Sequence, residues 1–191
     1  MSIRENIEAI RAEIDEAARE TGRTGADIVL VGASKMNDAA ACQEAIAAGI
    51  DALGENRVQE MTAKLAEVDK QAEKLGLVQD ILLEVNIGGE EAKSGFAPGE
   101  LEDAAKAAQA MEHIRVHGLM TIPPADCSRE ENIHYFQEVR ALYVDINEKL
   151  FHNKLECLSM GMSGDFEDAI RNGATMVRVG TAIFGARHYP T

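Results

Sequence analysis

Strand-like and helix-like stretches alternate along almost the whole sequence. The strand-like stretches are continuously apolar, which is typical of parallel strands covered by helices on both faces. Six can be recognised, within residues 28–35, 50–56, 78–87, 114–122, 155–163 and 175–181. The pattern predicts repeated strand–helix units and an α/β fold with a parallel sheet. A closed barrel of this construction has eight strands, so six strands predict an incomplete barrel.

The helix-like stretches carry apolar residues every three or four positions. The first covers residues 2–20, where Ser2 and Glu5 form a capping-box pattern and Gly22 suits the end of the helix. Ser128 and Glu131 form a second capping-box pattern at the start of a helix that reaches about residue 150. The remaining predicted helices cover residues 37–49, 57–75, 99–111 and 165–172.

Length and charge limit the possible functions. A chain of 191 residues with 46% apolar content can bury one core, so we expect residues 1–191 to form a single domain. The net charge of −14 disfavours binding to nucleic acid or to a membrane surface, and scarce aromatic residues without tryptophan disfavour stacking on bases. The N-terminus is charged and no apolar run reaches membrane-spanning length, which predicts a cytoplasmic protein.

Polar residues follow several strands at the end where parallel α/β folds carry their active sites. Lys35 follows the first strand, although a lone lysine in this position is most often a solvated loop residue. Arg178 lies between Val177 and Val179 inside an apolar strand, and an arginine buried there needs a partner. An arginine that points outward to a helix carboxylate is the alternative.

Glycine-rich turns follow the last two strands. They read "SMGMSGD" and "RVGT", and the loops after the last two strands form the usual phosphate site of such barrels. Glycines let the backbone approach a ligand, and a helix N-terminus supplies free N–H groups. A lysine, a phosphate site and a buried arginine together indicate pyridoxal phosphate (PLP), because lysine forms a Schiff base with an aldehyde once its pKa is lowered.

With these motifs the sequence resembles the PLP homeostasis proteins, single-domain relatives of the alanine racemase barrel. The resemblance runs from the first strand almost to the C-terminus, in the stretches "VLVGASK", "LGENRVQE", "LLEVNIGGEEAKSGF", "GLMTIPP", "LSMGMSGDFEDAI" and "GATMVRVGTAIFGAR". It implies a (β/α) barrel of the alanine racemase N-terminal type and PLP as the cofactor.

The resemblance also implies roles for single residues. Lys35 would hold PLP as a Schiff base, and Arg178 would face the pyridine nitrogen, where it keeps the ring a poor electron sink. The other cofactor-binding residues would be Asn56, Ser159, Met160, Ser163, Gly180 and Thr181. The implied function is to bind, buffer and deliver PLP to apo PLP enzymes, without assigned turnover. The alternatives are a PLP-dependent amino-acid racemase and a truncated relative that no longer binds PLP.

One segment of the family pattern is missing here. Between "LGENRVQE" and "LLEVN" the family has two further strands and a helix, with a stretch like "HFIGHLQxNK", and this chain has only "MTAKLAEVDKQAEKLGLVQDI". The loss explains the six strands. We expect strands 50–56 and 81–86 to lack their usual neighbours, which predicts an open sheet and a monomer or weak homodimer. His113 and His117 lack a nearby carboxylate or thiol motif, so we expect no metal site.

Overall fold

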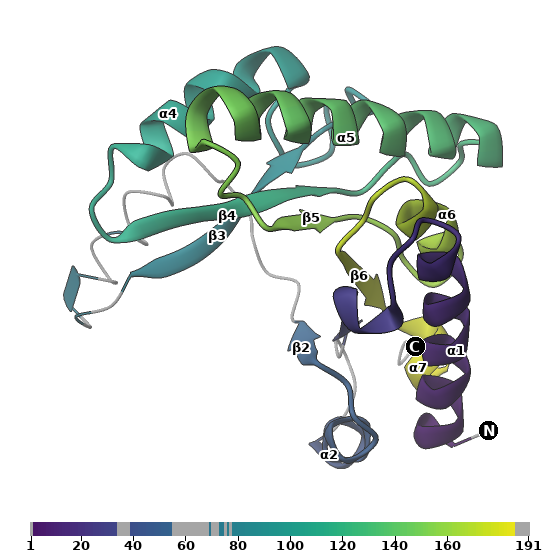
Figure 1. Cartoon of the computed structure of the whole chain (residues 1–191). Coiled ribbons are helices and arrows are strands. Elements are labelled where there is room, and N and C mark those ends of the chain that lie inside the picture. The colour runs from purple at the N-terminus through teal and green to yellow at the C-terminus, as the bar shows by residue number, and fades with distance from the viewer. Residues whose placement is uncertain are drawn as a thin grey trace. The chain divides into compact units, whose positions relative to one another are not determined.

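The structure is a computed structural model that describes residues 2–33, 39–54, 69, 73–74, 76 and 78–185 (Figure 1). The chain forms two compact units. One combines Met1–Arg57 with Met160–Thr191, and the other is Val58–Ser159. In the described part of the chain no helix is both long and apolar enough to cross a membrane.

The first unit contains a parallel sheet in the order β2-β1-β6. Val31 of β1 pairs with Ala52 of β2 on one side and with Arg178 of β6 on the other. Both sides of β1 are therefore hydrogen-bonded, which suits the buried side chains of Leu30 and Val31 in this strand. The elements of this unit are α1 (Ile3–Arg19), η1 (Gly25–Asp27), β1 (Val29–Ala33), α2 (Ala39–Ala47), β2 (Ala52–Gly54), α6 (Phe166–Arg171), β6 (Met176–Val179) and α7 (Thr181–Phe184).

Helix α1 confirms both the predicted capping box and the predicted apolar face. Ser2 accepts a hydrogen bond from the Glu5 N–H at 3.2 Å, and the Glu5 carboxylate accepts one from the Ser2 N–H at 2.8 Å. The apolar face is buried through Ile7, Ile10 and Ile14, because residues three and four apart lie on one side of a helix. This helix packs beside α6 and α7 (Figure 1).

The second unit contains a parallel sheet in the order β5-β4-β3, with a register shift between Ile81 and Leu82. Helices α4 and α5 lie on one side of these strands (Figure 1). Ser128 and Glu131 form the predicted capping box at the start of α5. The elements are β3 (Gln79–Val85), η2 (Pro98–Glu100), α4 (Leu101–Gln109), β4 (Ile114–Thr121), α5 (Arg129–Phe151) and β5 (Cys157–Ser159).

All six predicted strands are present, but the fifth is shorter than expected. It was predicted over residues 155–163 and covers only Cys157–Ser159. The cause is Gly161, whose φ of +97° lies in the left-handed region and turns the chain out of the strand. Residues 162–165 consequently form the turn that precedes α6.

Strands β2 and β3 do not pair with each other in the ladders of the described residues. The neighbour of β2 is β1, and the neighbour of β3 is β4. An isolated bridge joins Val85 of β3 to Phe96. The helix predicted over residues 57–75 lies outside the described residues except at Asp69, Glu73 and Lys74, which are helical.

Candidate functional site

Six of the eight predicted site residues lie within the described part of the chain. They are Ser159, Met160, Ser163, Arg178, Gly180 and Thr181. Lys35 and Asn56 lie outside it. Lys35 comes two residues after Ala33, the last residue of β1. The carboxyl ends of β1 and β6 meet at Gly180, where a Cβ atom would lie 3.3 Å from the Cβ of Ala33. Glycine therefore allows these two strand ends to pack closely.

The turn after β5 is packed firmly against α6. A Cβ atom on Gly161 would lie only 2.6 Å from the Cβ of Ala169 and 2.9 Å from the Cα of Phe166. The C=O of Gly161 accepts a hydrogen bond from the Arg178 N–H at 3.0 Å. The carboxylate of Asp165 accepts one from the Met162 N–H at 2.5 Å. These contacts hold the turn beside β6.

The hydroxyl of Ser163 brings the two predicted glycine-rich turns together. It accepts hydrogen bonds from the N–H of Gly180 at 3.2 Å and from the N–H of Ala182 at 3.3 Å. A serine hydroxyl that accepts two such bonds can still donate its own hydrogen. We call Ser163 with the N–H groups of Gly180 and Ala182 the Ser163 cluster.

The amide of Ala182 is a member of this cluster that the sequence did not single out. Its contribution comes from the backbone and leaves no signature in the residue type. The nearest signal was the "RVGT" motif, because a helix that starts at Thr181 leaves its first N–H groups without helical partners. Thr181 itself is exposed as the first residue of α7.

The side chain of Arg178 is less buried than the residues at the end of β5. The side chain of Arg178 is half-buried and alternates along β6 with the fully buried Val177 and Val179. It therefore lies on the opposite face of the strand from these two valines. Ser159 and Met160 are both fully buried, and the Met160 N–H donates to the C=O of Met176 at 3.2 Å.

The Ser163 cluster suits a phosphate group. In this structure both N–H groups donate to the Ser163 oxygen, and the Ser163 hydroxyl can still donate its own hydrogen to an anionic oxygen. A charge-assisted hydrogen bond of this kind is worth about 1.5–3 kcal/mol. Gly180 has no side chain of its own beside its N–H, and Ala33 occupies the space next to where its Cβ would lie, at 3.3 Å. The residues present therefore fit the phosphate end of PLP.

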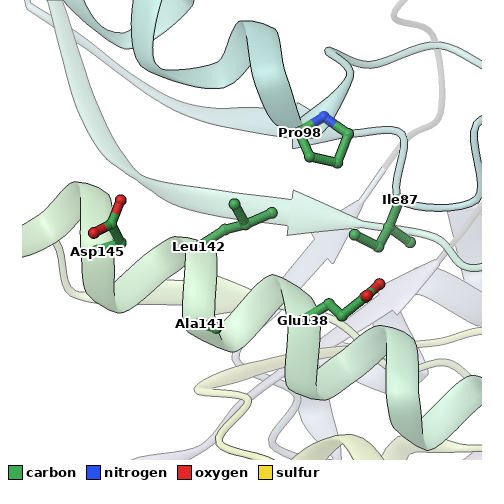
Figure 2. A pocket seen from close by; sticks show the side chains of 6 residues that line it. All are labelled: Ile87, Pro98, Glu138, Ala141, Leu142 and Asp145. Atoms are coloured by element: carbon green, nitrogen blue, oxygen red, sulfur yellow. The ribbon is translucent and has the colours of Figure 1, made fainter.

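A separate hollow in the second unit does not suit a phosphate. It has a volume of about 400 Å³ and is lined by Ile87, Pro98, Glu138, Ala141, Leu142 and Asp145 (Figure 2). None of these six side chains is cationic, and two are carboxylates. Glu138 lies 3.3 Å from His134 and Asp145 lies 2.8 Å from Lys149, so both carboxylates already have basic neighbours on α5.

Comparison with known proteins identifies the class to which this fold belongs. Residues 61–188 match the family model of the alanine racemase N-terminal domain. The fold also matches the structure of PipY from Synechococcus elongatus with PLP bound, with a TM-score of 0.76 and 26% identity over 96% of this chain and 100% of that one. The structure of an unknown protein from Bifidobacterium adolescentis matches with a TM-score of 0.86 and 27% identity, over 95% of this chain and 94% of that one. The fold is thus an α/β barrel of the alanine racemase N-terminal type, here incomplete.

Full-length relatives narrow the class to a family. A PLP homeostasis protein of Pseudomonas aeruginosa is 36% identical, with 98% of this chain and 97% of the relative covered. Another from Aquifex aeolicus is 33% identical, with 99% and 100% covered. The chain belongs to the PLP homeostasis protein family.

The same comparisons support the prediction that a segment of the family pattern is missing from this chain. The alignment with the Pseudomonas aeruginosa protein spans 228 positions, whereas this chain has 191 residues. At least 37 residues of the relative therefore have no counterpart here. This difference agrees with the loss of two strands and a helix predicted from the sequence.

Proposed function

We propose that this chain binds PLP and buffers or delivers it, as the names of its relatives imply for them. The observation that carries the proposal is the Ser163 cluster, which brings a serine hydroxyl and the N–H groups of Gly180 and Ala182 together at the end of β6. PLP in the PipY structure, which shares this fold, supports the choice of cofactor.

Each predicted residue has a role in this proposal. Ser163, Gly180 and Thr181, together with the N–H of Ala182, surround the phosphate. Lys35 supplies the amine that condenses with the aldehyde of PLP to form a Schiff base, with loss of water. Asn56, Ser159 and Met160 are the remaining residues that the family resemblance assigns to PLP binding.

Arg178 is the reason to propose a carrier instead of an enzyme. PLP supplies an electron sink for carbanions when its ring nitrogen is protonated. A guanidinium stays charged at all relevant pH values, and a positive charge beside the nitrogen opposes its protonation. With Arg178 in this position, efficient turnover of amino acids is not expected.

In this proposal, residues 1–191 act as one PLP-binding domain. The partners of the chain are PLP and the apo PLP enzymes that receive it. The chain itself is a monomer or a weak homodimer.

The deciding experiment is reduction of the PLP-loaded chain with borohydride, followed by peptide mapping. We expect a new absorbance band on addition of PLP and, after reduction, a label on Lys35 alone. The Lys35→Ala variant should take up no label. Lys93→Ala is the matched control and should behave like the parent, because Lys93 is committed to the Pro123 C=O at 3.0 Å and to Glu90. A label on another lysine, or no band in the parent, would overturn the proposal.

An assay of alanine racemisation separates a carrier from an enzyme. We expect no activity above that of free PLP. Turnover at a rate typical of a dedicated enzyme, abolished in Lys35→Ala, would show that the chain is a racemase.

A further inference from the structure

The four-residue helix α7 depends on tertiary contacts for its position. A helix this short is not stable alone, because the first turn costs more conformational entropy than its hydrogen bonds return. Its internal bonds run from Ile183 and Phe184 to the C=O of Gly180, and from Gly185 to the C=O of Thr181. The carbonyl groups of its last turn therefore need partners outside the helix.

Asn6 of α1 provides one of these partners. Its side-chain amide donates a hydrogen bond to the C=O of Ile183 at 2.8 Å, across a sequence separation of 177 residues. The contact is partly buried, and the side chain of Ile183 is fully buried. The apolar face of α1 begins at the adjacent Ile7, also buried, so the contact is anchored in the core of the unit.

The same short helix carries the amide of Ala182, one of the two donors to Ser163. A shift of α7 along its axis would move this N–H while leaving the ends of β1 and β6 paired. We infer that Asn6 is a positioning residue for the phosphate end of the site: by holding the Ile183 carbonyl it fixes where the Ala182 amide points. This inference rests on the proposed PLP-binding function.

The neighbouring Arg4 provides a matched control on the same helix. Its guanidinium donates to the C=O of Ala47 at 3.2 Å, at the end of α2. Both side chains thus tie α1 to a backbone carbonyl at the end of another helix, but only Asn6 reaches α7. A general weakening of α1 packing would affect both variants, whereas loss of positioning would appear only when Asn6 is changed.

The test compares affinities for PLP and for pyridoxal, which lacks the phosphate. For Asn6→Ala we expect PLP affinity to fall about fivefold, the effect of one lost hydrogen bond, with pyridoxal affinity unchanged within twofold. Asn6→Asp, which keeps the shape but cannot donate, should fall at least as far. Asn6→Gln, which keeps the donor, should recover part of the loss, and Arg4→Ala should match the parent for both ligands.

Hydrogen exchange of residues 180–185 provides a readout without ligand. We expect faster exchange there in Asn6→Ala than in Arg4→Ala. If the parent binds PLP and the Asn6→Ala variant binds it with the same affinity, this inference is overturned and the proposed function is not. An equal loss for both ligands would also overturn it, because the damage would not be specific to the phosphate end. A parent that binds neither ligand would overturn the proposed function, and this inference with it.

Discussion

Ser163 shows how much of the candidate site depends on single atoms. One hydroxyl oxygen accepts the N–H groups of Gly180 and Ala182, at 3.2 and 3.3 Å, from the end of β6 and from the start of α7. Gly161, two residues before it, has no side chain at a point where any Cβ atom would overlap Ala169. The hydroxyl of Ser163 joins the two turns, and the lack of a side chain on Gly161 lets the first turn pack against α6.

We predict that Ser163→Ala weakens binding of PLP by about tenfold or more, because the variant loses the hydroxyl that would donate to the phosphate and that holds the N–H groups of Gly180 and Ala182 in place. Binding of pyridoxal should change little. Fluorescence or absorbance titration measures both. Ser128→Ala is a control for stability: it removes the cap of α5, should cost about 1 kcal/mol of unfolding free energy, and should leave both affinities unchanged. Equal losses for PLP and pyridoxal in Ser163→Ala would contradict the prediction.

We predict that Gly161→Ala destabilises the fold by about 2 kcal/mol or more. The alanine would have to adopt a φ of +97°, and its Cβ would lie 2.6 Å from that of Ala169. Gly164→Ala in the same turn is the matched control, since nothing lies within 4 Å of the Cβ position there. It should change stability by no more than about 0.5 kcal/mol. Urea denaturation of the two variants measures the difference, and similar values for both would count against this account of the turn.

Helix α1 and the residues that follow it contact several elements of their unit. Arg11 forms an ion pair with Asp51 at 2.7 Å, and Asp51 in turn accepts the N–H of Leu30 in β1 at 2.7 Å. Beyond the C-terminal end of α1, Arg23 donates to the carbonyls of Ile170 and Ala174, at 2.6 and 2.7 Å, and so caps α6. The first helix and the segment after it are thereby linked to β1, α6 and α7, the elements that flank the candidate site.

A second link to α6, from Glu20 at the C-terminal cap of α1, depends on pH. Arg171 of α6 donates two hydrogen bonds to the Glu20 carboxylate, at 2.7 and 3.1 Å. The hydrogen bond from Arg171 lowers the pKa of Glu20 below its ordinary value of 4.5, and the charge of Arg171 adds to this effect. The same pairing raises the pKa of Arg171. Because the folded-state pKa of Glu20 is lowered, the link stabilises the fold above the unfolded pKa, and this stabilisation is lost as the pH falls through the folded-state pKa.

We therefore predict that Glu20→Gln lowers the melting temperature at pH 7, and that the difference from the parent disappears as the pH is lowered through and below about 4.5. Glu13→Gln, on the exposed side of α1, is the control and should change the melting temperature little at pH 7 or at acid pH. Thermal unfolding followed by circular dichroism across this range measures the difference. A difference that stayed constant or grew towards acid would show that the ion pair is not its source.

At the scale of the whole molecule, the strand edges deserve a prediction, because β3 pairs only with β4 in the ladders of the described residues. Phe96 covers part of the side of β3 that does not pair with β4. Its N–H donates to the C=O of Glu84 at 2.8 Å, and its C=O accepts the N–H of Asn86 at 2.9 Å. Unpaired strand edges invite pairing with other chains, so the loop over residues 87–95 brings back a residue that protects the carboxyl end of β3.

We predict that Phe96→Pro increases self-association, because proline has no N–H to donate to Glu84 and uncovers the edge of β3. Phe96→Leu keeps the N–H and should behave like the parent. Sedimentation velocity over a range of protein concentrations measures the effect. If Phe96→Pro remained folded and sedimented as the parent does, the backbone of Phe96 would not be what keeps this edge from pairing.

Local patterns predicted most of the elements correctly. The capping boxes at Ser2 and Ser128 and the apolar spacing of α1 identify these helices because their causes lie within a few residues. Runs of apolar residues identified all six strands for the same reason. The motifs around Ser163 and Gly180 also indicated a phosphate site and the family, and both turns do meet at one hydroxyl.

Only the tertiary structure decided the rest. The sequence could not show that β5 ends at Ser159, because the turn at Gly161 is set by its packing against Ala169 and Phe166 of another element. Nor could it single out the amide of Ala182 or the contact of Asn6 with Ile183, since a backbone donor has no residue type and the two partners are 177 positions apart. Preferences for helix, strand and turn depend on residues that are close in sequence. The geometry of the site depends on contacts that form only when distant segments pack together.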